Sequence, residues 1–97
     1  MAAVELAPEL ADDFDRILGH LVANAAEDTA SRISDIVRAI DVLESNPLIG
    51  RPAGGHLREL VIGRRSRGYV ALYRYVEEID TVFVLALRSQ REAGYVR

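Results

Sequence analysis

The sequence contains no cysteine. Disulfide bonds and thiolate metal sites are therefore excluded, and nothing indicates an oxidising compartment. Apolar runs also stay far below the ~20 residues that a membrane helix requires, and Glu5 interrupts the first residues too early for a signal peptide. We therefore expect a cytoplasmic protein without a membrane span, whose 97 residues form one domain over residues 1–97.

The sequence also contains no lysine, so all twelve basic residues are arginine. Their distribution along the chain is uneven. The segment up to Ile49 contains three arginines and ten carboxylates, a net charge of −7. The segment from Gly50 onward contains nine arginines and five carboxylates, a net charge of +4. This division predicts a basic surface in the second half, suited to phosphates or acidic protein segments. Arginine favours planar, bidentate contacts, although a coding bias explains its exclusive use equally well.

Standard catalytic signatures are missing. The pair 54–55 is Gly-Gly, but it precedes an expected strand and lacks the lysine and helix start of a phosphate-binding loop. His20 and His56 lie far apart in the sequence, without partners at metal-ligand spacing. We therefore expect no cofactor and no metal site.

Two amphipathic helices are predicted in the first half. Residues 8–25 carry apolar side chains at helical spacing, namely Leu10, Phe14, Ile17, Leu18 and Leu21. A second stripe follows Thr29 and ends before the segment 45–47, through Ile33, Ile36, Val37, Ile40 and Leu43. The short link between them predicts an antiparallel helix hairpin.

The second half is typical of strands. Residues 46–56 contain too many proline and glycine residues for any regular element, and strands are predicted over 57–62, 68–76 and 81–87, with a further short strand over 4–6. The last two strands are apolar on both faces and should lie centrally. The fold class is α+β in the order β-α-α-β-β-β, with the hairpin on one face of a mostly antiparallel sheet.

Two groups of charged residues have alternative interpretations. The carboxylates at the start of the first helix, Asp12, Asp13 and Asp15, are explained by the helix dipole and by solubility. Arg74 shares a strand face with apolar residues, so it either pairs with an internal acid such as Glu59 or faces a partner.

Four segments together resemble the RelE/ParE toxin superfamily over nearly the whole chain. They are the loop Asn-Pro-Leu-Ile-Gly-Arg-Pro at 46–52, Leu-Arg-Glu-Leu at 57–60, Arg-Gly-Tyr-Val-Ala-Leu-Tyr-Arg at 67–74 and Leu-Ala-Leu-Arg-Ser-Gln-Arg-Glu at 85–92. The resemblance implies the toxin of a bacterial type II toxin–antitoxin pair, with a cognate antitoxin as its partner in a hetero-oligomer.

The superfamily contains two functional classes. RelE-like members cleave messenger RNA on the ribosome, and the positions similar to their site residues are Arg58, Arg91 and Tyr95. Cleavage requires charge stabilisation and proton transfer, but arginine is a poor acid or base, and Val70 stands where RelE enzymes carry an arginine. ParE-like members poison DNA gyrase without a catalytic set, and this class fits better. The residues that we expect to bind the target are Arg64, Arg65, Arg67, Arg74 and Arg91.

Overall fold

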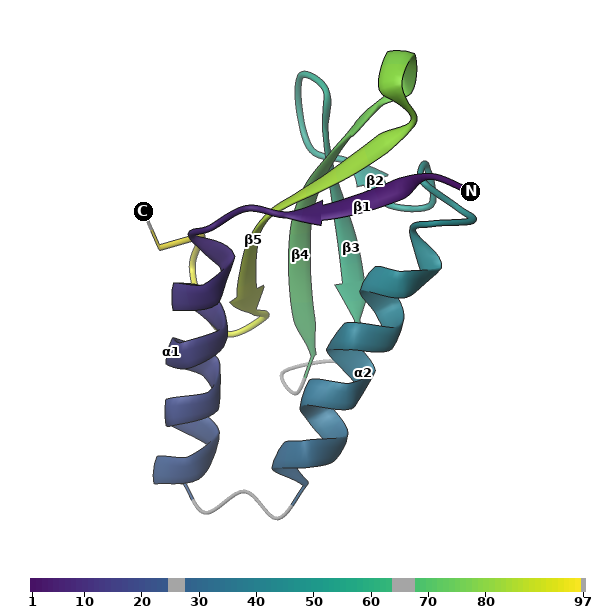
Figure 1. Ribbon diagram of the computed structural model, residues 1–97. Coiled ribbons are helices and arrows are strands. Elements are labelled where there is room, and N and C mark those ends of the chain that lie inside the picture. Colours follow the sequence, from purple (N-terminus) through teal and green to yellow (C-terminus); the bar gives the residue numbers. More distant parts are fainter. Residues whose placement is uncertain (25–27, 64–67, 97) are drawn as a thin grey trace.

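A computed structural model describes residues 1–24, 28–63 and 68–96 (Figure 1). The chain forms strand β1 (Ala3–Leu6), helices α1 (Leu10–Ala23) and α2 (Thr29–Val42), and then strands β2 (Arg51–Pro52), β3 (Leu57–Ile62), β4 (Tyr69–Val76) and β5 (Thr81–Ser89). The 3-10 turn Glu77–Ile79 joins the last two strands. Neither described helix is long and apolar enough to cross a membrane.

The five strands form one sheet in the order β1-β5-β4-β3-β2. β1 pairs in parallel with β5, while the other neighbours are antiparallel. Both helices lie on the same face of this sheet, where α1 contacts β5 and α2 contacts β3 (Figure 1). The predicted α+β class, the helix hairpin and the central position of the last two strands are therefore confirmed.

The core lies between the helices and the sheet. The first helical stripe contributes three buried apolar residues, Leu10, Ile17 and Leu21, and the second contributes Ile36, Ile40 and Leu43. The sheet contributes alternating residues of β4, namely Tyr69, Ala71 and Tyr73. Leu18 and Val37 were predicted on these stripes, but they are 42% and 47% exposed. Each directly follows a buried residue, and a step of about 100° along a helix turns it away from the sheet.

The segment 46–56 departs from the prediction. It was expected to contain no regular element, but Arg51 and Pro52 pair with Glu59 and Arg58 as the short strand β2. β2 is the last strand at this edge of the sheet, where proline is tolerated because its missing N–H is not needed by a further strand. Two residues are too few to produce a recognisable alternation in sequence, so the strand could not be predicted.

Candidate functional site

A groove of about 760 Å³ opens between the two helices and one end of the sheet. Its apolar lining comes from Ile17 and Leu21 of α1 and from Tyr69, the first residue of β4. Its charged lining consists of Arg16 on α1, Arg32 on α2, and Arg91 and Glu92 after β5, with His20 also on α1. Two of these arginines are paired within the fold, since Arg16 forms ion pairs with Asp13 and Glu92 and Arg32 forms one with Asp28. Arg91 is the lining arginine for which no ion pair is found among the described residues.

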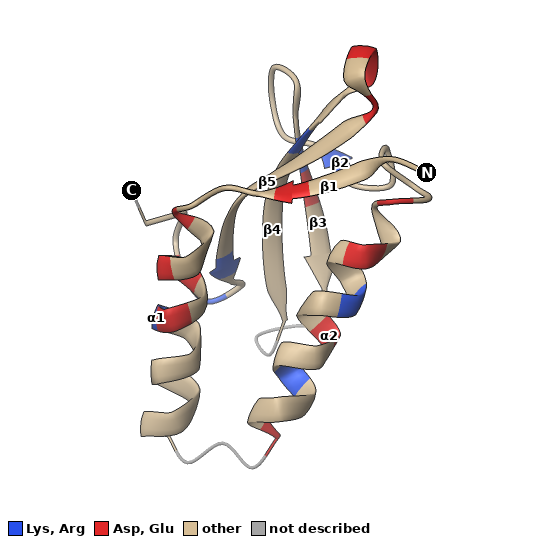
Figure 2. Ribbon diagram, in the orientation of Figure 1, with Lys and Arg blue, Asp and Glu red and all other residues tan. Residues whose placement is uncertain are grey.

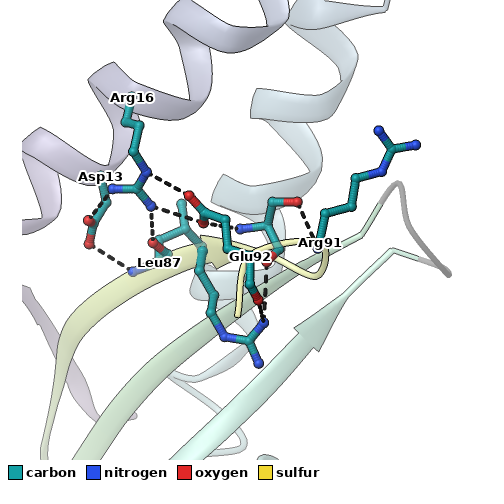
Figure 3. Close-up of polar contacts among 7 residues, drawn as sticks. Asp13, Arg16, Leu87, Arg91 and Glu92 are labelled. Atoms are coloured by element: carbon teal, nitrogen blue, oxygen red, sulfur yellow. Dashed lines mark hydrogen bonds and ion pairs between the residues drawn. The ribbon is translucent and has the colours of Figure 1, made fainter. Parts of the chain in front are cut away.

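A network of charged residues, of which Asp13 is buried and Arg16 and Glu92 are partly exposed, connects α1 to β5 at the side of this groove (Figure 3). Asp13 is only 1% exposed, and its two oxygens accept hydrogen bonds from the Leu87 backbone N–H (3.0 Å) and from Arg16 Nη1 (2.8 Å). The Arg16 guanidinium also donates to the Leu87 carbonyl at 3.1 Å. A buried carboxylate is stable only when it is paired and hydrogen-bonded, and both conditions are met here.

The same guanidinium binds the carboxylate of Glu92 through two bonds, from Nε to Oε1 at 2.8 Å and from Nη2 to Oε2 at 3.1 Å. Glu92 Oε2 also accepts the backbone N–H of Ser89 at 2.9 Å. Burial raises the pKa of Glu92, but the hydrogen bonds from Arg16 and Ser89 outweigh it, so the net shift is downward. Glu92 is therefore held as a carboxylate between α1 and the end of β5.

Arg91 lies inside the turn that these bonds hold. Its backbone N–H donates to Ser89 Oγ at 3.1 Å, and its exposed side chain extends away from the Arg16 network in Figure 3. Among the residues that the structure describes, no carboxylate lies within ion-pair distance of its guanidinium. The turn thus presents an exposed cation at the groove.

A second polar cluster occupies the helix-free face of the sheet. The Tyr95 hydroxyl donates to Glu59 Oε2 at 2.6 Å, and Arg51 Nη2 lies 3.2 Å from the other oxygen, Oε1. The Arg88 guanidinium lies 5.3 Å from the centre of the Tyr95 ring and 4.0 Å from Glu59. The Tyr95 hydrogen bond, followed by the Arg51 contact, holds the pKa of Glu59 below its ordinary value despite partial burial. This cluster pins the last described residues of the chain onto the sheet.

The three residues predicted for a nuclease do not meet in one place. Arg58 donates from Nη1 to the carbonyls of Leu48 (3.1 Å) and Gly50 (2.7 Å), and so braces the loop before β2. Its neighbour Glu59 points to the opposite face, because successive strand residues alternate, and Tyr95 follows Glu59 to that face. Arg91 lies at the groove beside the helices. Arg58 and Tyr95 are therefore separated by the sheet.

The residues predicted to bind a target are partly described. Arg64, Arg65 and Arg67 lie outside the described residues. Arg74 is exposed, and it sits opposite Leu57 and Phe83 in the sheet, so the alternative in which it pairs with Glu59 is wrong. Arg51 and Tyr95 bind that carboxylate instead.

The network centred on Arg16 was not predicted, and the interpretation of Asp13 was wrong. Asp13 was assigned to the helix dipole and solubility, together with its neighbours. A signal was nevertheless present, because positions 10, 13, 17 and 21 recur at the spacing of one helix face, and the other three are buried apolar residues. A carboxylate on a core stripe requires a cationic partner, which the sequence alone could not identify.

The charges are distributed unevenly over the fold (Figure 2). Carboxylates mark α1 and the turn between β4 and β5, whereas the strands carry arginine at β2 and at the end of β5. Within residues 1–24, 28–63 and 68–96, no three His, Asp or Glu side chains are grouped closely enough to hold a metal ion.

Comparisons with known proteins agree with this architecture. A family model described as the ParE toxin of the type II toxin–antitoxin system parDE matches residues 4–94. A solved structure of the chromosomal ParDE TA system from P. aeruginosa shares the fold with a TM-score of 0.73 and 24% sequence identity, covering 92% of this chain and 96% of that chain. No curated protein sequence matches the chain.

Proposed function

Because this chain belongs to the family of ParE toxins of type II toxin–antitoxin systems, we propose that it binds and inhibits DNA gyrase and that a cognate antitoxin neutralises it. The family match over residues 4–94 is the observation that carries this proposal. The match includes both helices, β1 from Val4 onward, the other four strands and the turn that presents Arg91.

The positions of the candidate side chains support binding over cleavage. A nuclease without a metal must place charge-stabilising and proton-transferring groups around one phosphate. Here Arg58 is occupied by two loop carbonyls, and Tyr95 is bonded to Glu59 on the opposite face of the sheet. Burial raises the pKa of Tyr95, and its bond to Glu59 raises it further, so this hydroxyl is a weak acid in the folded chain. A binding protein needs no such convergence.

Arg91 is the described residue best suited to contact the target. It is exposed at a groove rich in arginine, and its backbone is fixed by the Ser89 hydroxyl. The end of the sheet that carries Arg91 also carries Ile62 and Tyr69, because Tyr69 pairs with both Ile62 and Ser89. We assign this end of the molecule to the target.

A supercoiling assay with purified gyrase tests the proposal. We expect the chain to inhibit supercoiling, and we expect Arg91→Ala to raise the concentration for half inhibition about tenfold, since a hydrogen bond to a charged group contributes roughly 1.5–3 kcal/mol. Arg38→Ala removes an exposed arginine from α2 and serves as the matched control, with inhibition unchanged.

Unchanged supercoiling at saturating wild-type protein contradicts gyrase inhibition. The competing activity, ribosome-dependent cleavage of messenger RNA, is read by primer extension on translated messages. Codon-linked cuts that Arg91→Ala or Arg58→Ala abolishes would replace the proposal with the nuclease alternative.

A further inference from the structure

Arg16 forms more hydrogen bonds and ion pairs than are needed to pack α1 against the sheet. One guanidinium bonds to both oxygens of Glu92, to Asp13 and to the Leu87 carbonyl, with distances between 2.8 and 3.1 Å. The Arg16 and Glu92 side chains are 29% and 30% exposed, so this ion pair lies at the rim of the groove and not in the core. The planar fork of arginine fits a carboxylate in one orientation, and therefore fixes direction as well as distance.

Glu92 transmits this orientation to the turn after β5. Its Oε2 accepts the Ser89 N–H at 2.9 Å, its own N–H donates to the Ser89 carbonyl at 3.1 Å, and its carbonyl accepts Arg88 Nη1 at 3.1 Å. The turn thus closes on itself around Arg91, whose N–H is held by Ser89 Oγ. Without Arg16, the Glu92 carboxylate would lose two of its three bonds and would have no fixed position for the Ser89 amide.

We propose that Arg16 is a positioning residue of the target-binding end, which orders the turn Ser89–Glu92 through Glu92 and thereby sets the direction of Arg91. Asp13 completes this arrangement by holding the other edge of the same guanidinium and the Leu87 N–H. Helix α1 and the turn, 76 residues apart at the Arg16–Glu92 contact, then behave as one unit. The assignment of Arg91 to the target rests on the proposed function, whereas the ordering of the turn does not.

Amide hydrogen exchange tests the ordering directly. In Arg16→Ala, we expect the Ser89 and Glu92 amides to exchange about tenfold faster or more, because local opening is no longer opposed by the two charged bonds. The amide of Ala71, which is fully buried in β4, should exchange as in the wild type and so report an intact sheet. Arg38→Ala is again the control and should leave all three amides unchanged.

A double-mutant cycle separates positioning from direct contact and from general destabilisation. We expect Arg16→Ala to weaken gyrase inhibition about tenfold in the wild type and to have no further effect in Arg91→Ala, since residues that act through one another are not additive. If Arg16 touched the target itself, or if its loss unfolded the chain, the two effects would add.

Two results overturn the inference, namely unchanged exchange at Ser89 and Glu92 in Arg16→Ala, or additive effects of the two substitutions. If the wild-type chain does not inhibit gyrase, the proposed function fails, and the same cycle is then measured as growth arrest after induced expression. Non-additivity in that assay supports the positioning role, and additivity refutes it.

Discussion

Gly50 is placed where no side chain fits. Its backbone N–H donates to the Tyr73 hydroxyl at 2.8 Å, and a Cβ at this position would lie 2.6 Å from the Tyr73 ring and 2.8 Å from the Glu59 carbonyl. Tyr73 is fully buried, and burial raises the pKa of its hydroxyl, which therefore stays protonated. The glycine of the Asn-Pro-x-x-Gly-Arg loop thus lets the loop close over the core.

We predict that Gly50→Ala lowers the free energy of unfolding by about 1–3 kcal/mol, because the added methyl group must displace backbone or a packed ring. Gly19→Ala is the matched control, since its Cβ would meet nothing within 4 Å and lies within α1. That change should stabilise the protein by about 0.5–1 kcal/mol, because alanine is the better helix former. Chemical denaturation measures both, and equal effects would contradict the packing argument.

At the scale of elements, the C-terminal segment is attached to the fold at two points. Glu92 binds Arg16 beside the helices, and Tyr95 binds Glu59 on the helix-free face. The segment therefore passes around the end of β5 and joins both faces of the sheet. Because each attachment depends on a carboxylate, its strength depends on pH.

We predict that acid weakens the Tyr95 attachment through Glu59. The pKa of Glu59 in the folded chain is lower than its ordinary value of 4.5, so its stabilising contribution is complete above pH 4.5 and is lost as the pH falls through the lower folded pKa. Glu59→Gln should therefore cost about 0.5–1.5 kcal/mol at neutral pH and progressively less in acid.

The measurement is urea denaturation of both proteins from pH 7 to pH 3. Glu78→Gln, at an exposed position in the turn after β4, is the control. Its free energy of unfolding should change with pH in the same way as that of the wild type. A difference between wild type and Glu59→Gln that stays constant over this range would show that the carboxylate charge has no part in the attachment.

For the whole molecule, the uneven distribution of charge along the chain determines which charge a partner of each half must carry. The segment from Gly50 onward carries a net charge of +4, while the chain as a whole carries −3. α1 and the β4–β5 turn concentrate the carboxylates, and the strands carry exposed arginines such as Arg74 (Figure 2). An antitoxin that masks the basic half would need an acidic segment.

We predict that association with the cognate antitoxin is steered by charge. The association rate should fall about tenfold between low and high salt, because screening removes long-range attraction between exposed charges. Stopped-flow binding at several ionic strengths measures this rate. If the rate does not change with salt, the antitoxin covers apolar surface instead, to which exposed residues of both helices such as Leu18, Val22 and Val37 can contribute.

Much of this architecture followed from local patterns. The stripe through Leu10, Ile17 and Leu21 defines α1, and the alternation through Tyr69, Ala71 and Tyr73 defines β4. Such signals are local, since a helix or a strand exposes a periodic set of residues to one apolar surface. The order of elements and the segments that resemble ParE toxins could therefore be obtained without coordinates.

The partners of charged residues could not be obtained in that way. Asp13 and Arg16 are adjacent on one helix face, but Leu87, which bonds to both, and Glu92, which bonds to Arg16, lie more than seventy residues further along the chain. Glu59 was a plausible partner for Arg74 on sequence grounds, yet strand register and the returning C-terminal segment give it to Arg51 and Tyr95.

The sequence by itself thus determined the helices, the main strands and the family, because periodicity and motif order are properties of neighbouring residues. Only the tertiary structure decided which arginine side chains bond to groups within the fold and which remain exposed. That outcome depends on register and on chain return, which place residues remote in sequence within hydrogen-bonding distance. Arg58 and Arg16 are held within the fold for this reason, and Arg91 is presented at its surface.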